Sequence, residues 1–284
     1  MTSRIVKFSC PDRVGLLAEV SAIFAANRCN LTEVNQYTDM EAGWFFARFE
    51  FEPPNLAPPS ECPVSEEIAA LAKSVGGEWT SRPKSLRRKL AILCSRDGHC
   101  LADLLWRWRS GSLPFDLVGV LSNHGQLGSV VEREGVPFAV IPVGVDRDAS
   151  FRSVSSTVSS WGAEVIVLAR YMQILPPWLC REWENRAINI HHSFLPAFPG
   201  ASPYLQAYKK GVKIIGATCH YVTAELDAGP IIEQEVLRVS HFHGPEDLVH
   251  AGQDCERMAL SRGLLYHLED RVFCHRGKTV VFSG

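Results

Sequence analysis

The sequence predicts an α/β protein built from two domains, and three observations support this prediction. The chain has 284 residues, and at roughly 150 residues per domain that length corresponds to about two domains. Residues 1–84 carry short strand and helix patterns in the order β-α-β-β-α-β. The remainder alternates continuous apolar strands with helices, which is typical of a mostly parallel sheet covered on both faces.

The predicted first domain covers residues 1–84 and has the element order of a ferredoxin-like fold. Its first strand alternates apolar and polar residues, and its first helix repeats apolar residues at helical spacing from Leu16 onward. Ser65 is expected to cap the second helix, which Gly76 ends. The four strands are expected at Arg4–Ser9, Leu31–Thr38, Gly43–Phe51 and Glu78–Ser81.

The predicted second domain covers residues 85–284, and its strands and helices alternate along the chain. Strands are expected at Leu90–Cys94, Asp116–Ser122, Phe138–Ile141, Glu164–Ala169, Ala187–Ile190, Ile214–Val222 and Ile231–Val239. Helices are expected near Leu101–Trp108, Gly128–Glu134, Ser150–Trp161 and Pro245–Leu268, and a hairpin over Arg271–Phe282 closes the domain.

Composition excludes several classes of protein. Hydrophobic residues make up 46% of the chain and charged residues 21%, so the chain is not mainly disordered. A net charge of -2 argues against a nucleic-acid binder that relies on broad phosphate attraction. No apolar run approaches the roughly 18 residues of a membrane span, and the first residues lack the apolar region of a signal peptide. Since the nine cysteines include no CxxC pair, reduced thiols and a cytoplasmic location are expected.

The densest polar cluster surrounds Asn189 and His191, at the end of an apolar strand. Ligands of open parallel sheets bind outside the carboxyl ends of the strands. Residues two apart in a strand point to the same side, so an amide and an imidazole would converge here. That pair can polarise a carbonyl oxygen. The alternative is that both side chains only satisfy local backbone groups, and the Pro-Gly loop that follows favours the functional interpretation.

Two further clusters leave both interpretations open at this point. Asp227 lies in a loop closed by Gly229-Pro230, and its carboxylate could shuttle protons or simply form an Asx turn. The run from Tyr171 to Leu175 follows a buried strand. Its side chains could form a flat apolar slot, although core packing alone would explain them equally well.

Motifs for other chemistries are absent from the sequence. There is no HExxH metalloprotease motif and no GxSxG nucleophile elbow, and the histidines and cysteines show no convincing spacing for a metal. The turn after the first strand of the second domain, Ser95–Cys100, contains a single glycine. It is therefore poorly suited to holding a phosphate on backbone N–H groups.

These residues resemble a known family. Asn189-Ile190-His191, with Phe194-Leu195-Pro196 and Gly200, resembles the signature of folate-dependent formyltransferases, and Leu226–Ile232 resembles their catalytic aspartate loop. The closer resemblance is to formyltetrahydrofolate deformylases, through residues 191–198, 203–208, 211–218 and 278–282. Residues 10–17 resemble the ligand loop of an ACT module. The resemblance implies an ACT domain followed by a Rossmann-like formyltransferase domain.

The resemblance also implies a reaction and a site. The expected activity is hydrolysis of 10-formyltetrahydrofolate to tetrahydrofolate and formate, which balances folate pools and supplies formate for purine synthesis. Asn189 and His191 would stabilise the oxyanion, and Asp227, with a pKa raised by partial burial, would transfer protons. No metal or other cofactor is expected. Folate would contact Tyr171, Met172, Gln173, Ile174, Leu175, His220 and Val222, beside an active-site wall of Ser95, His99 and Asn123.

Two rival functions are weighed against hydrolysis. A glycinamide ribonucleotide formyltransferase would need a glycine-rich phosphate turn, and His99 would intrude where the phosphate should sit. A non-catalytic amino-acid sensor would not need Asn189, His191 and Asp227. An amino-acid effector could bind the loop of Asp12, Arg13, Val14, Gly15 and Leu16 through N–H groups at the start of a helix; a plain turn is the equal alternative. By analogy with ACT proteins, a homodimer or homotetramer is expected.

Overall fold

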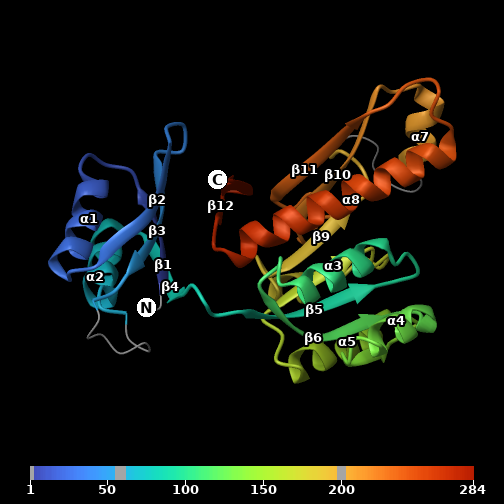
Figure 1. The fold of residues 1–284 in the computed structure, drawn as a ribbon, viewed down its shortest axis with the longest axis horizontal. Coiled ribbons are helices and arrows are strands. Elements are labelled where there is room, and N and C mark those ends of the chain that lie inside the picture. The colour runs from blue at the N-terminus through green and yellow to red at the C-terminus, as the bar shows by residue number, and fades with distance from the viewer. Residues whose placement is uncertain (1–2, 55–61, 197–202) are drawn as a thin grey trace. The chain divides into compact units, whose positions relative to one another are not determined.

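The computed structural model describes residues 3–54, 62–196 and 203–284, and the chain divides into two compact units. The first unit contains a four-stranded antiparallel sheet with the strand order β2-β3-β1-β4 and two helices (Figure 1). Its elements follow the predicted order β-α-β-β-α-β. They are β1 (Arg4–Pro11), α1 (Leu16–Ala26), β2 (Asn30–Asp39), β3 (Trp44–Glu52), α2 (Ser65–Val75) and β4 (Glu78–Pro83).

Strand β3 shows why the first unit folds as a layered structure. Phe45, Phe49 and Phe51 lie two or four residues apart, so they project from one face of the strand. There they join the core formed by α1 and α2, which contribute Phe24 and Ile68 among others. On the opposite face Arg48 is buried, 1% exposed, and pairs with Glu33 and Glu50. Apolar burial therefore fixes the register of the sheet.

The C-terminal segment corrects the predicted domain boundary. The prediction assigned all of residues 85–284 to the second domain, but Glu269–Phe273 and Val280–Gly284 belong to the first unit. The physical reason lies in β12 (Val272–His275). The ring of Phe273 packs against Phe46, at 5.6 Å between ring centroids, and Lys7 Nζ donates to the carbonyl oxygen of Val272. Periodicity along the chain carries no signal for contacts so distant in sequence.

The second unit is built around a seven-stranded sheet of order β11-β10-β9-β8-β5-β6-β7. Strands β9, β8, β5, β6 and β7 are parallel, and β10 and β11 continue the sheet in antiparallel pairs, so the predicted mostly parallel sheet is confirmed. The strands are β5 (Arg88–Cys94), β6 (Phe115–Ser122), β7 (Phe138–Val140), β8 (Val165–Ala169), β9 (Ala187–His191), β10 (Ile214–Tyr221) and β11 (Ile231–Arg238); a small sheet adds β13 (Lys278–Val281) to β12.

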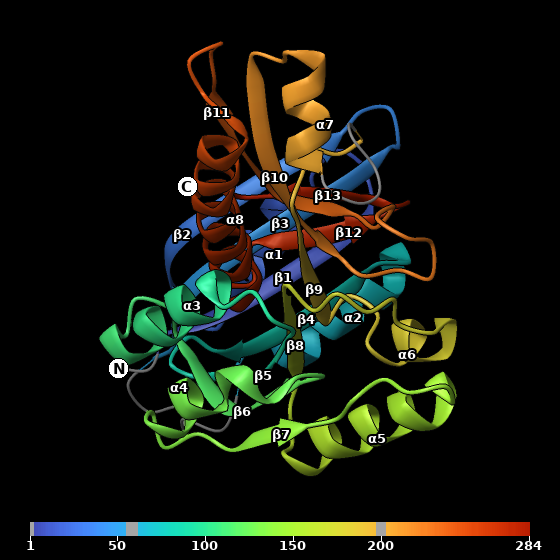
Figure 2. The same ribbon diagram turned by 90° about the vertical axis from the view of Figure 1, so that its right-hand side faces the viewer.

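Helices cover both faces of this sheet. Figure 2 shows α3 and α8 to one side of β8 and α5 and α6 to the other. Phe151 and Val154 of α5 and Leu179 of α6 form one core with β5 and β8, whereas α8 packs against β9, β10 and β11. The helices are α3 (His99–Ser110), α4 (Gly128–Glu132), α5 (Arg147–Ser160), α6 (Pro177–Glu182), α7 (Pro203–Lys210) and α8 (Pro245–Leu268), with a 3-10 turn at Gly125–Leu127.

The strand order indicates at which edge of the sheet a ligand would bind. From β5 the chain moves to β6 on one side, and from β7 it returns to β8 on the other side of β5. Such a reversal is the topological switch point at which open α/β sheets bind ligands, outside the carboxyl ends of the strands. In this unit those ends belong to β5, β8 and β9.

Local details differ from the prediction at helix starts and in short helices. Ser65 is the first residue of α2 rather than its cap, because Val64 occupies the cap position. Helix α5 begins at Arg147 because the Asp146 carboxylate accepts a hydrogen bond from the Ala149 N–H. Helices α6 and α7 were not predicted. Among the described residues, no helix is both long and apolar enough to cross a membrane.

Candidate active site

A cavity of about 710 Å³ opens at the switch point of the second unit. This volume lies within the range of small-molecule sites. Segments that follow β5, β8 and β9 surround it, together with the loop between β10 and β11 and one face of α8. Its lining includes Asp97, His99, Arg170, Tyr171, Met172, Gln173, Ile174, Leu175, Asn189, His191, His192, Tyr204, His220, Val222, Leu226, Asp227 and Glu256.

Asn189 is held by His220, which faces it from the neighbouring strand β10. His220 Nδ1 lies 2.9 Å from the Tyr221 carbonyl oxygen, so Nδ1 must carry a proton and donate it. Burial lowers the pKa of His220 and favours the neutral ring. Its Nε2 is then an acceptor, and Asn189 Nδ2 donates to it over 3.1 Å. The orientation of the Asn189 amide is thereby fixed, and one N–H of that amide stays available to the cavity.

His191 and Asp227 form the second pair of the site. His191 Nδ1 lies 3.2 Å from Asp227 Oδ1, and His191 is only 6% exposed. The other ring nitrogen, Nε2, is buried and has no hydrogen-bond partner among the described residues. A carboxylate on one nitrogen of an imidazole fixes the orientation of the ring. The second nitrogen of this ring is thereby left for a bound group.

The expected rise in the pKa of Asp227 is wrong in direction. The hydrogen bond from His191 lowers the pKa of the Asp227 carboxyl, and it outweighs the opposing effect of partial burial. Asp227 is consequently a carboxylate at neutral pH and can accept a proton.

The predicted slot residues lie together on one side of the cavity. Tyr171, Leu175 and Val222 belong to or pack against the core beneath it, whereas Met172 and Ile174 are 56% and 60% exposed. Gln173 also lines the cavity. This side therefore offers a mostly apolar surface to a flat ring system.

Ser95 and Asn123 lie behind the slot and are not among the lining residues. The Ser95 hydroxyl donates to Asn123 Oδ1 over 2.7 Å and accepts from the Met172 N–H over 2.9 Å. Both side chains are buried. They fix the backbone of the slot, while His99, the third residue of the predicted wall, lines the cavity.

The opposite end of the cavity carries charges that sequence reasoning missed. Glu256 of α8 is 1% exposed and accepts from His99 Nε2 over 2.8 Å and from the Tyr204 hydroxyl over 2.7 Å. Arg170 Nη2 lies 2.8 Å from the Asp97 carboxylate. Arg170 follows β8 directly, so its place at a strand end was a usable signal. Glu256 lies within a long helix and belongs to no local motif.

The predicted effector loop forms the start of α1 in the first unit. Gly15 is the cap residue with a φ of 92°, and Leu16 is buried in the core. Val14 is 98% exposed. Arg13 forms a two-pronged ion pair with Glu19 across the first turn of the helix. Of the five residues, Leu16 therefore serves packing, whereas the others lie at the surface.

Comparison with known proteins agrees with this architecture. The family model described as formyl transferase matches residues 88–264, and the ACT domain model matches residues 4–58. A formyltetrahydrofolate deformylase of Corynebacterium sp. (strain P-1) is 42% identical over 278 residues, which cover 98% of this chain and 97% of that protein. The chain belongs to the formyltetrahydrofolate deformylase family.

Solved structures extend the comparison to the whole deformylase fold. A formyltetrahydrofolate deformylase from Pseudomonas syringae pv. tomato is 48% identical, with a TM-score of 0.95 over 99% of this chain and 95% of that chain. A glycinamide ribonucleotide transformylase from Symbiobacterium toebii is 29% identical, with a TM-score of 0.65 over 69% of this chain and 94% of that chain. The resemblance to deformylases, with an ACT domain before a formyltransferase domain, is confirmed. Residues 197–202, part of the quoted signature, lie outside the described residues.

Proposed function

We propose that this chain hydrolyses 10-formyltetrahydrofolate to tetrahydrofolate and formate. The observation that supports this function most directly is the convergence of Asn189, His191 and Asp227 beside an apolar slot, in a chain of the deformylase family. The slot suits a flat pterin ring, and the three polar side chains suit the cleavage of an N-formyl amide.

Asn189 and His191 would act on the formyl oxygen. When water attacks the formyl carbon, that oxygen becomes negative, and donors already in place stabilise the charge without reorganisation. The Asn189 amide is oriented by His220, and His191 is oriented by Asp227. An imidazolium at His191 would donate to Asp227 from Nδ1 and to the oxyanion from Nε2.

Asp227 would move the protons of the reaction. As a carboxylate it takes one proton from the attacking water while the oxygen–carbon bond forms. The bond between the formyl carbon and N10 then breaks, and N10 receives a proton through Asp227. Formate and tetrahydrofolate result without any change of oxidation state.

The finer expectations remain proposals. No metal or organic cofactor takes part in this mechanism, so incubation with EDTA followed by desalting should leave the rate unchanged; loss of activity restored by zinc or iron would contradict it. The protein is proposed to be a cytoplasmic homodimer or homotetramer. A small amino acid is proposed to act as an effector at the loop of residues 12–16.

Formate release from 10-formyltetrahydrofolate by the purified chain tests the function. Equal amounts of formate and tetrahydrofolate are expected, at a rate proportional to protein. A glycinamide ribonucleotide formyltransferase is the rival of the same fold; it would release little formate and consume substrate only with the ribonucleotide present. A non-catalytic amino-acid sensor would release no formate.

A further inference from the structure

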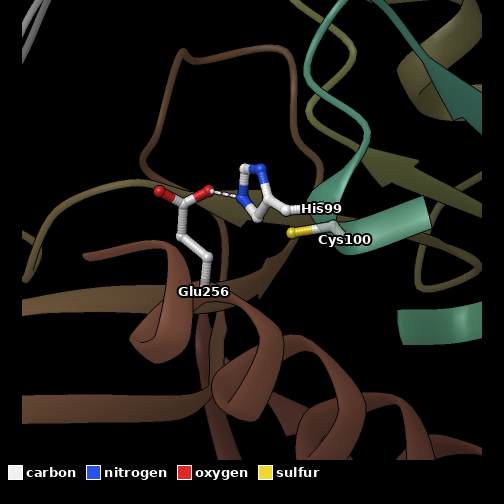
Figure 3. Close-up of side chains that lie close together, drawn as sticks. All are labelled: His99, Cys100 and Glu256. Atoms are coloured by element: carbon white, nitrogen blue, oxygen red, sulfur yellow. Dashed lines mark hydrogen bonds and ion pairs between the residues drawn. The ribbon is translucent and has the colours of Figure 1, made fainter. Parts of the chain in front are cut away.

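His99, Cys100 and Glu256 lie close together at the polar end of the cavity, where the start of α3 meets α8 (Figure 3). One ligand atom from each lies within 4.8 Å of the others. Such a group invites comparison with a metal site, because His, Cys and Glu are common ligands of zinc. The surrounding groups decide between a metal site and a network of hydrogen bonds.

The atoms of this group that could bind a metal do not suit a cation, because those of Glu256 and His99 already bond to neighbouring protein groups. One oxygen of Glu256 accepts from Tyr204 and the other from His99. Arg170 Nε lies 3.5 Å from the same carboxylate, so a positive charge is already present there. Burial also raises the pKa of the Cys100 thiol well above its ordinary value, and a thiol binds metals poorly because the thiolate is the ligand.

The network lies where the start of α3 meets the switch point of the sheet. It begins in the turn between β5 and α3, and the start of a helix at a switch point is where α/β proteins commonly hold an anion. In this turn Asp97 supplies a carboxylate of the chain itself, and Arg170 neutralises it over 2.8 Å. His99 projects from the first residue of α3 onto Glu256.

Ring contacts lead from this network to His191. The His192 ring lies 5.2 Å from His191 and 6.1 Å from Tyr204 between ring centroids. Tyr204 reaches Glu256 because Gly252 of α8 leaves the space, since a side chain at that position would overlap the Tyr204 ring. These side chains therefore form a continuous wall of the cavity from Glu256 to His191.

We propose that His99 and Glu256 determine acceptor specificity: the pair fills the space that a second substrate would need, so that water is the nucleophile that reaches the formyl carbon. Glu256 is a positioning residue, because it holds His99 in place through a charge-assisted hydrogen bond. This inference rests on the proposed hydrolysis of 10-formyltetrahydrofolate. It explains how one fold can serve either hydrolysis or transfer to an amine.

Partition of the formyl group between water and glycinamide tests the proposal. In the transfer reaction the bond between the formyl carbon and N10 breaks, a bond to the glycinamide nitrogen forms, and one proton passes from that nitrogen to N10. No redox change occurs, and the products are N-formylglycinamide and tetrahydrofolate. The ratio of N-formylglycinamide to formate, measured by mass spectrometry and corrected for the reaction without protein, is the readout.

His99→Ala should raise this ratio on the order of tenfold, a change typical of vacating space in a specific site. The variant keeps Glu256 paired with Arg170 and Tyr204, so no buried charge is left alone. Glu134→Gln is the matched control, because it removes a carboxylate that pairs with Arg109 elsewhere in this unit; it should give the wild-type ratio. A wild-type ratio in folded His99→Ala would overturn the proposal.

Glu256→Gln tests the positioning role separately. Glutamine keeps the volume of the side chain but loses its charge, so the bond that holds His99 weakens. The ratio should lie between those of the wild type and His99→Ala, and a wild-type ratio would overturn the part assigned to Glu256. Failure of the proposed function is distinguishable, because the wild type would then release no formate at all, whereas failure of this inference leaves wild-type hydrolysis intact.

Discussion

The Asn189 amide is held by a neighbouring histidine. Because His220 Nε2 accepts from Asn189 Nδ2 over 3.1 Å, the amide cannot rotate freely to exchange its oxygen and nitrogen. As the proposed oxyanion donor, Asn189 would be in place before substrate binds, and preorganisation of this kind is what makes an oxyanion site effective.

Asn189→Ala should therefore lower kcat on the order of 100- to 1000-fold, the usual cost of one oxyanion donor. The fold should persist, since the Asn189 side chain is only partly buried at the strand end. Steady-state formate release measures kcat, and circular dichroism with thermal unfolding serves as the structural control. Activity within a few-fold of the wild type would remove Asn189 from the oxyanion role.

The pH dependence of turnover should report the His191–Asp227 pair. The hydrogen bond from His191 lowers the pKa of Asp227, so the active carboxylate persists on acidification and is lost only as the pH falls through that lowered pKa. In His191→Ala the pKa of Asp227 should rise. Carboxyl carbon NMR of the two proteins measures both values, and an unchanged or lower pKa in the variant would contradict this pairing.

The same pair contributes to stability in a defined direction. A carboxyl whose pKa is lowered by folding stabilises the protein above its unfolded-state pKa, and this contribution disappears as the pH falls through the folded-state value. For Asp227 the affected window lies at and below the ordinary pKa of an aspartate, 3.8. The neutral range should therefore show no change in stability from this group.

At the residue level, sequence was informative only where neighbours in the chain are neighbours in the site. Asn189 and His191 share one strand end, and Asp227 lies in a loop marked by Gly229-Pro230, so short patterns singled out all three as candidates, and the resemblance assigned Asp227 its role. The contact between His99 and Glu256 spans 157 residues. No local period or motif encodes such a contact, and the network at the polar end was therefore missed.

Among the elements, the start of α1 has a conformation that selects glycine. Gly15 has a φ of 92°, and a residue with a Cβ is strained there. An effector carboxylate bound to the first N–H groups of α1 would also have to pass close to this position.

If the proposed effector binds there, Gly15→Val should abolish the response to amino acids while formate release without effector continues. Coupling between two sites is typically about 5- to 150-fold in affinity, so a screen of the common amino acids by rate and by calorimetry should detect the wild-type response. Gly76→Val is the matched control, since Gly76 also has a positive φ in this unit but ends α2. Equal responses in both variants would contradict an effector site at Gly15.

Helices could be predicted where the same hydrophobic spacing repeats over many turns. Helix α8 spans Pro245–Leu268, as its pattern indicates, because many turns repeat the same spacing. Helices α6 and α7 have six and eight residues, too few for a period to stand out. Helix α5 shows the effect of a single cap, since Asp146 rather than the serine-rich run sets its first turn.

At the level of the whole molecule, the two units are not consecutive stretches of chain. After α8 the polypeptide contributes Glu269–Phe273 and Val280–Gly284 to the first unit. In that unit the Glu269 carbonyl oxygen accepts from buried Arg48, and Asp270 pairs with Arg82. A domain boundary predicted from composition divides the chain at one point. It could therefore not detect that the chain returns to the first unit after α8.

Phe273→Ala should therefore destabilise the first unit, although position 273 lies far along the chain from its other strands. Phe273 is 6% exposed, packs on Phe46, and lies 4.4 Å beneath Lys7 Nζ. Removing a buried phenylalanine ring typically costs about 3–5 kcal/mol.

Hydrogen exchange by mass spectrometry should show this loss as faster exchange of the amides of β1 and β3, and calorimetry should show a lower unfolding temperature. Phe242→Ala is the matched control, because Phe242 is 84% exposed in the second unit and its loss should change neither measurement. Faster exchange confined to the second unit in Phe273→Ala would contradict the assignment of β12 to the first. The expected result would mean that a truncation after α8, which leaves every predicted strand of the first domain intact, still removes part of that domain's core.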